Sequence, residues 1–130
     1  MKLSEAIRMN GMMRPQGFGS LSIMSPTEPC ALGGALQSIG KQSTHRIANY
    51  IEIAVAWPWS NHPILKDCLV ADCDYIYADA TTNIFHLNDA HHWTREQIAD
   101  WVASIESQEE QAGISGKGPR VAVLEEKVCR

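Results

Sequence analysis

Four residues in the middle of the chain have the types and the spacing of a metal site. Four residues separate Cys68 from Cys73, twelve residues follow, and four residues separate His86 from His91. Zn²⁺ prefers thiolate sulfur and imidazole nitrogen as ligands, and in structural sites it takes four of them in a tetrahedron. All three spacings lie within the range of such sites. The sequence therefore predicts one zinc ion per chain, bound by these four side chains.

Packing and surface roles are the alternatives at these positions. Both cysteines can be buried thiols, His86 can be a core histidine and His91 a surface residue. His92 competes with His91, because one more intervening residue is also tolerated. Asn88 and Asp89 are better placed to form a turn, or to accept the second N–H group of a metal-bound histidine, than to bind the ion.

The predicted site is structural, because four protein ligands leave zinc no open position for water or substrate. The chain also has no G-x-S-x-G, P-loop, H-E-x-x-H or dinucleotide-binding motif. We therefore do not expect an enzyme. The alternative is a metal-dependent hydrolase in which only three of the residues bind the ion and Asp89 or Glu96 acts as the general base.

The segment from Cys68 to His91 resembles a ββα zinc finger in its spacing, C-x4-C-x12-H-x4-H, and has Tyr77 where the finger has a core aromatic residue. The resemblance implies a β-hairpin, with strands near residues 69–70 and 75–77, followed by a helix that carries the histidines. Asn83 departs from it, since the finger has a core leucine there. The positions that read bases in a DNA-binding finger hold neither Arg nor Lys, but Asp79, Thr82 and Phe85.

A second resemblance involves segments far apart in the chain. CALGGAL at residues 30–36 and HLNDAHHWTREQIADWV at residues 86–102 are similar to segments of small bacterial and prophage proteins of uncharacterised activity. In those proteins a cysteine pair precedes the second segment. The resemblance implies that the cysteine pair and the histidine pair belong with the last helix, and it implies no activity.

Helical periodicity predicts the elements that position the site. Helices are expected over residues 3–13, 30–40, 44–57 and 94–111. Thr94 and Gln97 have the spacing of a capping box at the start of the last helix. The apolar stripes of these helices predict one shared core, made of Ile7, Leu32, Leu36, Ile47, Ile51, Val55, Ile98, Trp101, Val102 and Ile105.

The predicted fold class is α-rich α+β. A compact helical domain is expected over residues 1–113, with the Cys-His metal-binding element at residues 66–93 before the last long helix. Residues 114–130 are expected to be a tail that docks as an arm or stays mobile. Cys30 is interpreted as a small buried residue rather than as a thiol activated by a helix terminus, and Cys129 has no assignable partner.

Composition narrows the possible partners. The formal net charge of -4 argues against a broad phosphate-binding surface. No apolar run approaches the ~20 residues that cross a bilayer, and the first residues lack the apolar region of a signal peptide, so the cytoplasm is the expected compartment. We expect a protein-interaction or regulatory module whose partner is another protein. A nucleic-acid-binding finger protein is the alternative, and the oligomeric state stays open.

Overall fold

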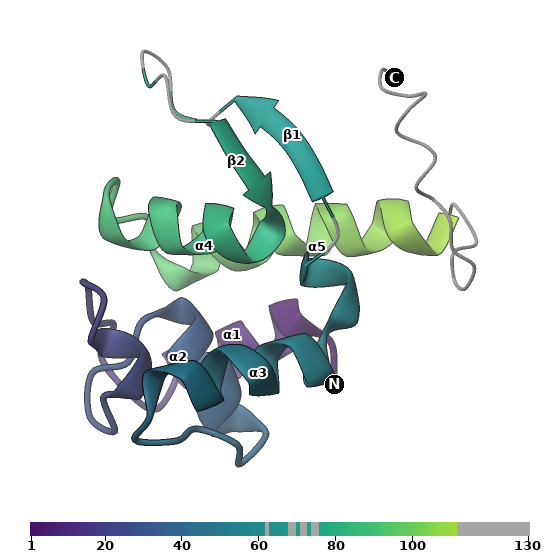
Figure 1. The fold of residues 1–130 in the computed structure, drawn as a ribbon. Helices are drawn as coiled ribbons and strands as arrows, with labels where there is room; N and C mark the ends of the chain where they lie inside the picture. The colour runs from purple at the N-terminus through teal and green to yellow at the C-terminus, as the bar shows by residue number, and fades with distance from the viewer. Residues whose placement is uncertain (62, 68–69, 71–72, 74–75, 112–130) are drawn as a thin grey trace.

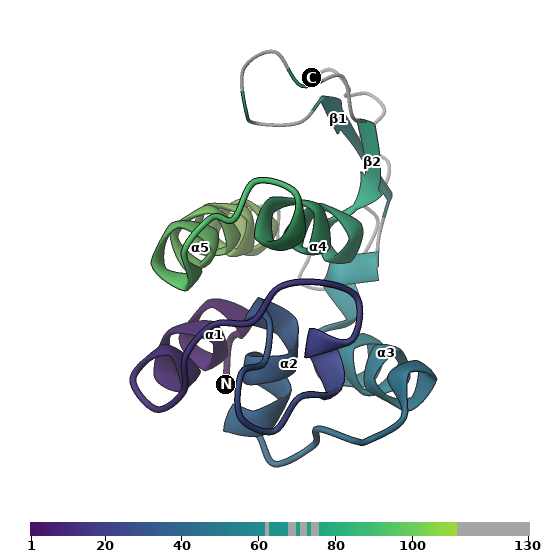
Figure 2. The same cartoon turned by 90° about the vertical axis from the view of Figure 1, so that its left-hand side faces the viewer.

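The computed structural model describes residues 1–61, 63–67, 70, 73 and 76–111. In this part of the chain, five α-helices lie in two layers, which confirms the predicted α-rich fold class (Figure 1, Figure 2). None of these helices is long and apolar enough to cross a membrane. One layer contains α4 (Ala80–Asp89) and α5 (Arg95–Gln111); the other contains α1 (Leu3–Gly11), α2 (Ala31–Ser38) and α3 (Arg46–Ala56).

One apolar core fills the space between the two layers. Helices α1, α2, α4 and α5 each contribute two or more fully buried apolar side chains, and the short 3₁₀ helix η1 (Ser22–Met24) contributes Ile23. Burial of the predicted core residues Ile7, Leu32, Leu36, Ile98, Val102 and Ile105 is confirmed. Trp101 is only partly buried and packs against the edge of this core.

Helix α2 approaches its neighbours so closely that two positions require glycine. A Cβ atom on Gly33 would lie 2.8 Å from the backbone oxygen of Ile23, and one on Gly34 would lie 2.4 Å from the side-chain oxygen of Asn10. Real Cβ atoms do not come this near. Gly40 then adopts a φ of 73°, in the left-handed region that glycine tolerates, and ends the turn after α2.

Polar side chains join α1 to α5 at the edge of the core. The hydroxyl of Ser4 donates to a Glu106 carboxylate oxygen at 2.7 Å, and both side chains are buried. Arg95, also buried, donates to the side-chain oxygen of Asn10 at 3.0 Å and to the carbonyl oxygen of Arg14. Buried polar groups must be hydrogen-bonded, so these contacts fix how α5 is turned against α1.

Helix α3 does not bury the apolar stripe that its sequence predicts. Ile47, Ile51 and Val55 are 71%, 58% and 70% exposed, so the prediction that they belong to the core is wrong. The buried residues of this helix are Asn49 and Ile53. The helix is thus rotated relative to the predicted orientation, and its aliphatic ridge faces away from the core.

Asn49 provides the physical reason for this rotation. Its side-chain oxygen accepts the backbone N–H of Ser43 at 2.6 Å, and its amide donates to the carbonyl oxygen of Ser43 at 2.9 Å. Both backbone groups lie where the chain turns into the helix, which begins at Arg46 rather than at a cap on Ser43 or Thr44. An inward Asn49 satisfies both groups at once and turns the opposite ridge outward.

Two strands lie between α3 and α4. β1 (Pro63–Asp67) and β2 (Ile76–Asp79) are antiparallel, and β2 leads directly into α4. Of the first strand predicted near residues 69–70, Leu69 lies outside the described residues and Val70 lies in a bend, so the prediction is wrong at Val70, and β1 lies earlier in the chain. The second, predicted at 75–77, begins at Ile76 in the described residues. The paired positions are Pro63 with Asp79, Lys66 with Tyr77 and Asp67 with Ile76.

The predicted C-terminal arm at residues 114–130, including Cys129, lies outside the described residues, as do Cys68, Leu69 and Tyr75.

Candidate metal centre

Helix α4 begins with a cap and carries the first histidine of the site near its end. The Asp79 carboxylate accepts the N–H of Thr82 at 2.8 Å, the bond that a helix start needs for its otherwise unpaired donors. His86 lies in the last turn of α4. Cys73 lies in the connection between β1 and β2, so the strands and the helix belong to one continuous stretch of chain.

A turn after α4 brings His91 back towards His86. The N–H of Trp93 donates to the carbonyl oxygen of Leu87 at 3.0 Å, which folds the chain over the end of the helix. His91 lies within this turn rather than on α4. The two histidines therefore come from a helix and a turn, whereas in the zinc-finger resemblance one helix presents both.

The predicted capping box then starts α5. The hydroxyl of Thr94 accepts the N–H of Gln97 at 3.1 Å, and the side-chain oxygen of Gln97 accepts the N–H of Thr94 at 2.9 Å. This confirms the prediction from the T-R-E-Q sequence. The cap fixes where the turn ends, and so helps to fix the position of His91.

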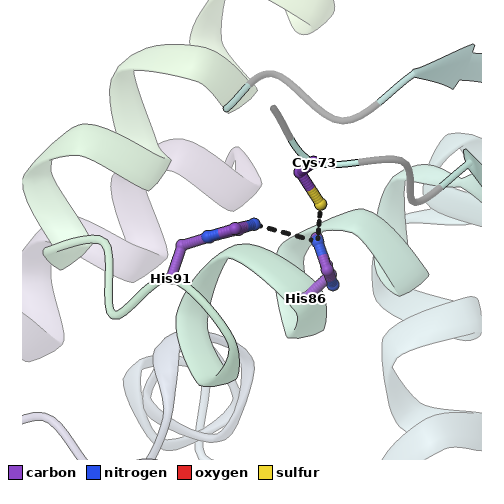
Figure 3. A group of neighbouring side chains, drawn as sticks. All are labelled: Cys73, His86 and His91. Carbon is purple, nitrogen blue, oxygen red and sulfur yellow. Dashed lines mark hydrogen bonds between the residues drawn. The ribbon is translucent and has the colours of Figure 1, made fainter. Parts of the chain in front are cut away.

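Cys73, His86 and His91 point towards a common point in space (Figure 3). Nε2 of His86 lies 3.1 Å from Nε2 of His91 and 3.5 Å from Sγ of Cys73. One ligand atom of each residue lies within 4.8 Å of the other two. The structure thus brings together three of the four residues whose spacing predicts a metal site.

These separations match the edges of a tetrahedral zinc site. With Zn–N near 2.05 Å and Zn–S near 2.3 Å, tetrahedral angles give edges of about 3.3 Å between two nitrogens and about 3.6 Å between nitrogen and sulfur. The 3.1 Å and 3.5 Å separations are close to both values. Two of the three ligand separations thus fit a tetrahedral site, and the third, between Cys73 and His91, is within 4.8 Å, so the three side chains could hold one metal ion.

Electrostatics at the two histidines favours the form that binds metal. Two nitrogen lone pairs facing each other 3.1 Å apart would repel, so a proton or a metal ion must lie between His86 and His91. Burial, and the positive charge that His91 can carry, lower the pKa of His86 below its ordinary value. The neutral imidazole, which is the metal ligand, therefore persists to a more acidic pH than in a solvated histidine.

The structure separates His91 from its competitor His92. His92 has a φ of 52°, and its ring stacks on Phe18 with the centroids 4.3 Å apart. It is not part of the metal-ligand group found among the described residues. Cys68, the fourth predicted ligand, lies outside those residues, so the four-ligand set stays a prediction.

Asn88 and Asp89 form the framework beneath the site. The side chain of Asn88 accepts the N–H of Ala31 at 3.1 Å and donates to the carbonyl oxygen of Gly17 at 3.0 Å. Asp89 accepts the N–H of Gly19 at 3.0 Å. These bonds attach the end of α4 to the start of α2 and to the loop before it; both residues lie in α4 rather than in a turn, so the predicted turn-forming role is wrong.

Two further residues of the sequence prediction have structural positions. Cys30 is 1% exposed, and burial raises the pKa of its thiol, so its interpretation as a small buried residue is confirmed. Asn83, which stands where the finger has leucine, is fully buried, and neither atom of its amide has a hydrogen-bond partner in the part of the chain that the structure describes. A buried amide without partners destabilises the fold, and nothing in the structure explains its presence.

A groove next to the metal centre is a feature that the sequence did not predict. It encloses about 550 Å³ and is lined by residues from α3, α4 and the cap between β2 and α4. Tyr50 and Phe85 form one wall, edge to face with their ring centroids 5.6 Å apart. His86 lies at the boundary between this groove and the metal centre. Tyr50 and Phe85 are 35 positions apart, so no local pattern connects them.

Comparisons with protein-family models, with curated proteins and with solved structures found no match to this chain.

Proposed function

We propose that the chain is a protein-interaction module stabilised by one structural zinc ion, which Cys68, Cys73, His86 and His91 bind. The observation that supports the proposal is the grouping of Cys73, His86 and His91 within 4.8 Å, with the two separations from His86 close to the edges of a zinc tetrahedron. Cys68, five positions before Cys73, supplies the fourth ligand. The resemblance to small bacterial and prophage proteins stays a prediction.

The donor set favours zinc over the hard cations. Mg²⁺ and Ca²⁺ take oxygen ligands, whereas a thiolate with imidazole nitrogens suits zinc. With both cysteines bound the shell is closed, so the ion has a structural role and offers no site for substrate.

In this proposal, zinc connects three segments of the chain. It links the connection between β1 and β2 to the end of α4 and to the turn that carries His91. In small finger peptides such an ion contributes an apparent ~10–16 kcal/mol, from which the cost of folding the segment is subtracted. The groove wall next to His86 is then held rigid.

The groove favours a protein partner over nucleic acid. Asp79, Thr82 and Phe85, which occupy the base-reading positions of the finger resemblance, all line it. Asp79 caps α4 and Phe85 packs against Tyr50, so neither resembles a side chain that binds phosphate or base edges. Asp89 accepts the Gly19 backbone N–H and the Asn88 side-chain N–H through Oδ1, a structural role that the hydrolase alternative does not require.

The test is the zinc content of the untagged full-length protein, measured by elemental analysis. We expect one zinc per chain in the wild type and in His92→Gln. His92 is the matched control, since it adjoins His91 but stacks on Phe18. Cys73→Ser, His86→Gln and His91→Gln should lose most of the zinc and melt at a lower temperature. Wild-type protein without stoichiometric zinc, or His91→Gln with a full complement, would contradict the proposal.

Cobalt substitution tests the ligand that the structure does not describe. Co²⁺ in a tetrahedral site with two thiolates gives a sulfur-to-metal absorption about twice that of a site with one. We expect this band to fall by half in Cys68→Ser, with the tetrahedral d–d bands retained at high cobalt. An unchanged spectrum would remove Cys68 from the shell, leave a position open for water and revive the hydrolase alternative.

A further inference from the structure

The ridge of α3 is a row of exposed apolar side chains on a regular helix. Ile47, Ile51 and Val55 lie four positions apart, so they form one continuous row along the helix. All three are more than half exposed. Isolated apolar residues on a surface are normal, whereas a contiguous row on a regular helix marks an interaction site.

The ridge continues into the groove beside the metal centre. Tyr50, on α3 and next to Ile51, borders the ridge and also forms the groove wall with Phe85. A partner lying along the ridge therefore meets the groove at its side. The groove wall at this side is already formed, because the rings of Tyr50 and Phe85 pack edge to face.

The charge in the groove selects the chemistry of the occupant. Asp79 and Asp89 both line it, and among the described residues no Lys or Arg does. The hydrogen bonds of these two carboxylates in the described structure use Oδ1, and each has a second oxygen that can accept. Aromatic walls beside carboxylates suit a cation on an apolar stem, because the stem packs on the rings and the head pairs with the oxygens.

We infer that the α3 ridge and the groove together form one docking surface for an amphipathic helical segment of another protein. Apolar residues of this segment, at helical spacing, pack on Ile47, Ile51 and Val55. A Lys or Arg of the same segment enters the groove, with its stem on the rings of Tyr50 and Phe85 and its charged group at the two carboxylates. The inference rests on the proposed function, an interaction module, and specifies its partner. The formal net charge of -4 adds attraction for a basic segment.

A second copy of this chain fits the surface less well. An antiparallel pair of α3 helices centred on Ile51 would place Ile47 against Val55 of the other copy. Four side chains from each copy, at about 100 Å² each, would bury about 800 Å², below the ~1,200 Å² of the smallest stable interfaces. Such a pair would also leave the acidic groove empty and bring together two molecules of like charge.

The experiment is a selection from a displayed library of helical peptides, with the immobilised full-length protein as bait. The library randomises the residues on one face of a fixed helical scaffold. The residue types that bind are therefore found by the selection and are not assumed. We expect enriched peptides to have apolar residues at i, i+4 and i+7 and an excess of Lys or Arg beside them. No enrichment above background, or an excess of Asp and Glu, would overturn the inference.

Three variants locate the binding of the enriched peptides. Ile51→Asp should weaken it at least ~10-fold, as expected for the centre of an interface. Asp79→Asn should weaken it about 3- to 10-fold, since Asn retains the cap on α4 but removes the charge. Met12→Asp is the matched control, an exposed apolar residue at the end of α1, on the far side of α2 from α3 (Figure 2). Equal binding by Ile51→Asp and wild type would overturn the inference.

Two other occupants have distinct signatures. A concentration-dependent dimer that Ile51→Asp dissociates, without peptide enrichment, would assign the ridge to a second copy. Peptide binding that occurs only in Val123→Asp would assign it to the chain's own C-terminal segment. Zinc content is measured on the same samples. If the wild-type protein contains one zinc per chain but binds no peptide, only this inference is overturned. If it binds peptide but contains no zinc, only the metal part of the proposed function is overturned.

Discussion

Helices α3 and α5 have similar apolar patterns and use them in opposite ways. In α5, Ile98 and Val102 stand four positions apart and are fully buried. In α3, Ile47, Ile51 and Val55 have the same spacing and face outward. Helical period alone therefore does not distinguish a ridge that builds the core from one that is left for another molecule.

The difference between the two helices comes from their polar residues. In α5, the buried Arg95 and Glu106 bond to α1 on the same side as the apolar ridge, so polar and apolar contacts favour one orientation. In α3, Asn49 lies opposite the ridge and bonds to Ser43. A buried amide without partners costs about 1–3 kcal/mol, about what burial of one of the three ridge side chains gains, and the observed rotation also buries Ile53, so the polar anchor and Ile53 together favour it.

Identical substitutions in the two ridges give the largest expected contrast. Ile98→Ala removes a fully buried side chain and should lower the free energy of unfolding by about 2–5 kcal/mol. Ile51→Ala, in the exposed ridge, should change it by less than about 0.5 kcal/mol. Urea unfolding of the two variants beside wild type measures both values. Similar losses would mean that α3 buries its ridge in solution and would end the comparison.

The sequence was sufficient for four of the helices and for grouping three residues of the candidate metal site. Apolar residues that recur at helical spacing predicted these helices, and the Thr94–Gln97 capping box predicted the start of α5. Both signals are local in the sequence. The spacing of Cys73, His86 and His91 was also enough to place them together. Such predictions succeed where one stretch of chain contains both the signal and its cause.

The remaining features depend on partners far away in the sequence. The choice of His91 over His92 follows from the stacking of His92 on Phe18, more than seventy positions earlier. The groove depends on Tyr50 meeting Phe85. The orientation of α3 was missed because a helical stripe shows which residues share a face, but not which face the rest of the molecule covers.

Removing the polar anchor of α3 should have the second-largest effect. Asn49→Ala leaves the N–H and carbonyl groups of Ser43 without their side-chain partner in a partly buried site, which should cost about 1–3 kcal/mol of unfolding free energy. Arg46→Ala, an exposed position on the same helix, is the control and should be nearly neutral. If Asn49→Ala were equally neutral in urea unfolding, the amide would not be what holds the rotation of α3.

The starts of the two helices provide the smallest contrast, with effects of opposite sign. Helix α5 has a complete capping box, so Thr94→Ala should cost about 1 kcal/mol. Helix α3 has no side-chain cap at His45, although the φ of -108° and ψ of 126° at that residue are those of a capping position. His45→Asp should therefore add about 0.5–1 kcal/mol to the free energy of unfolding, because the new carboxylate can accept a backbone N–H of the first turn and places negative charge at the positive end of the helix.

The control for this gain is His45→Ala, which removes the imidazole without adding a cap and should give no gain. A gain in His45→Asp would show that α3 is held by its anchor and not by its cap, whereas no gain would mean that the first turn of α3 is already satisfied by other groups.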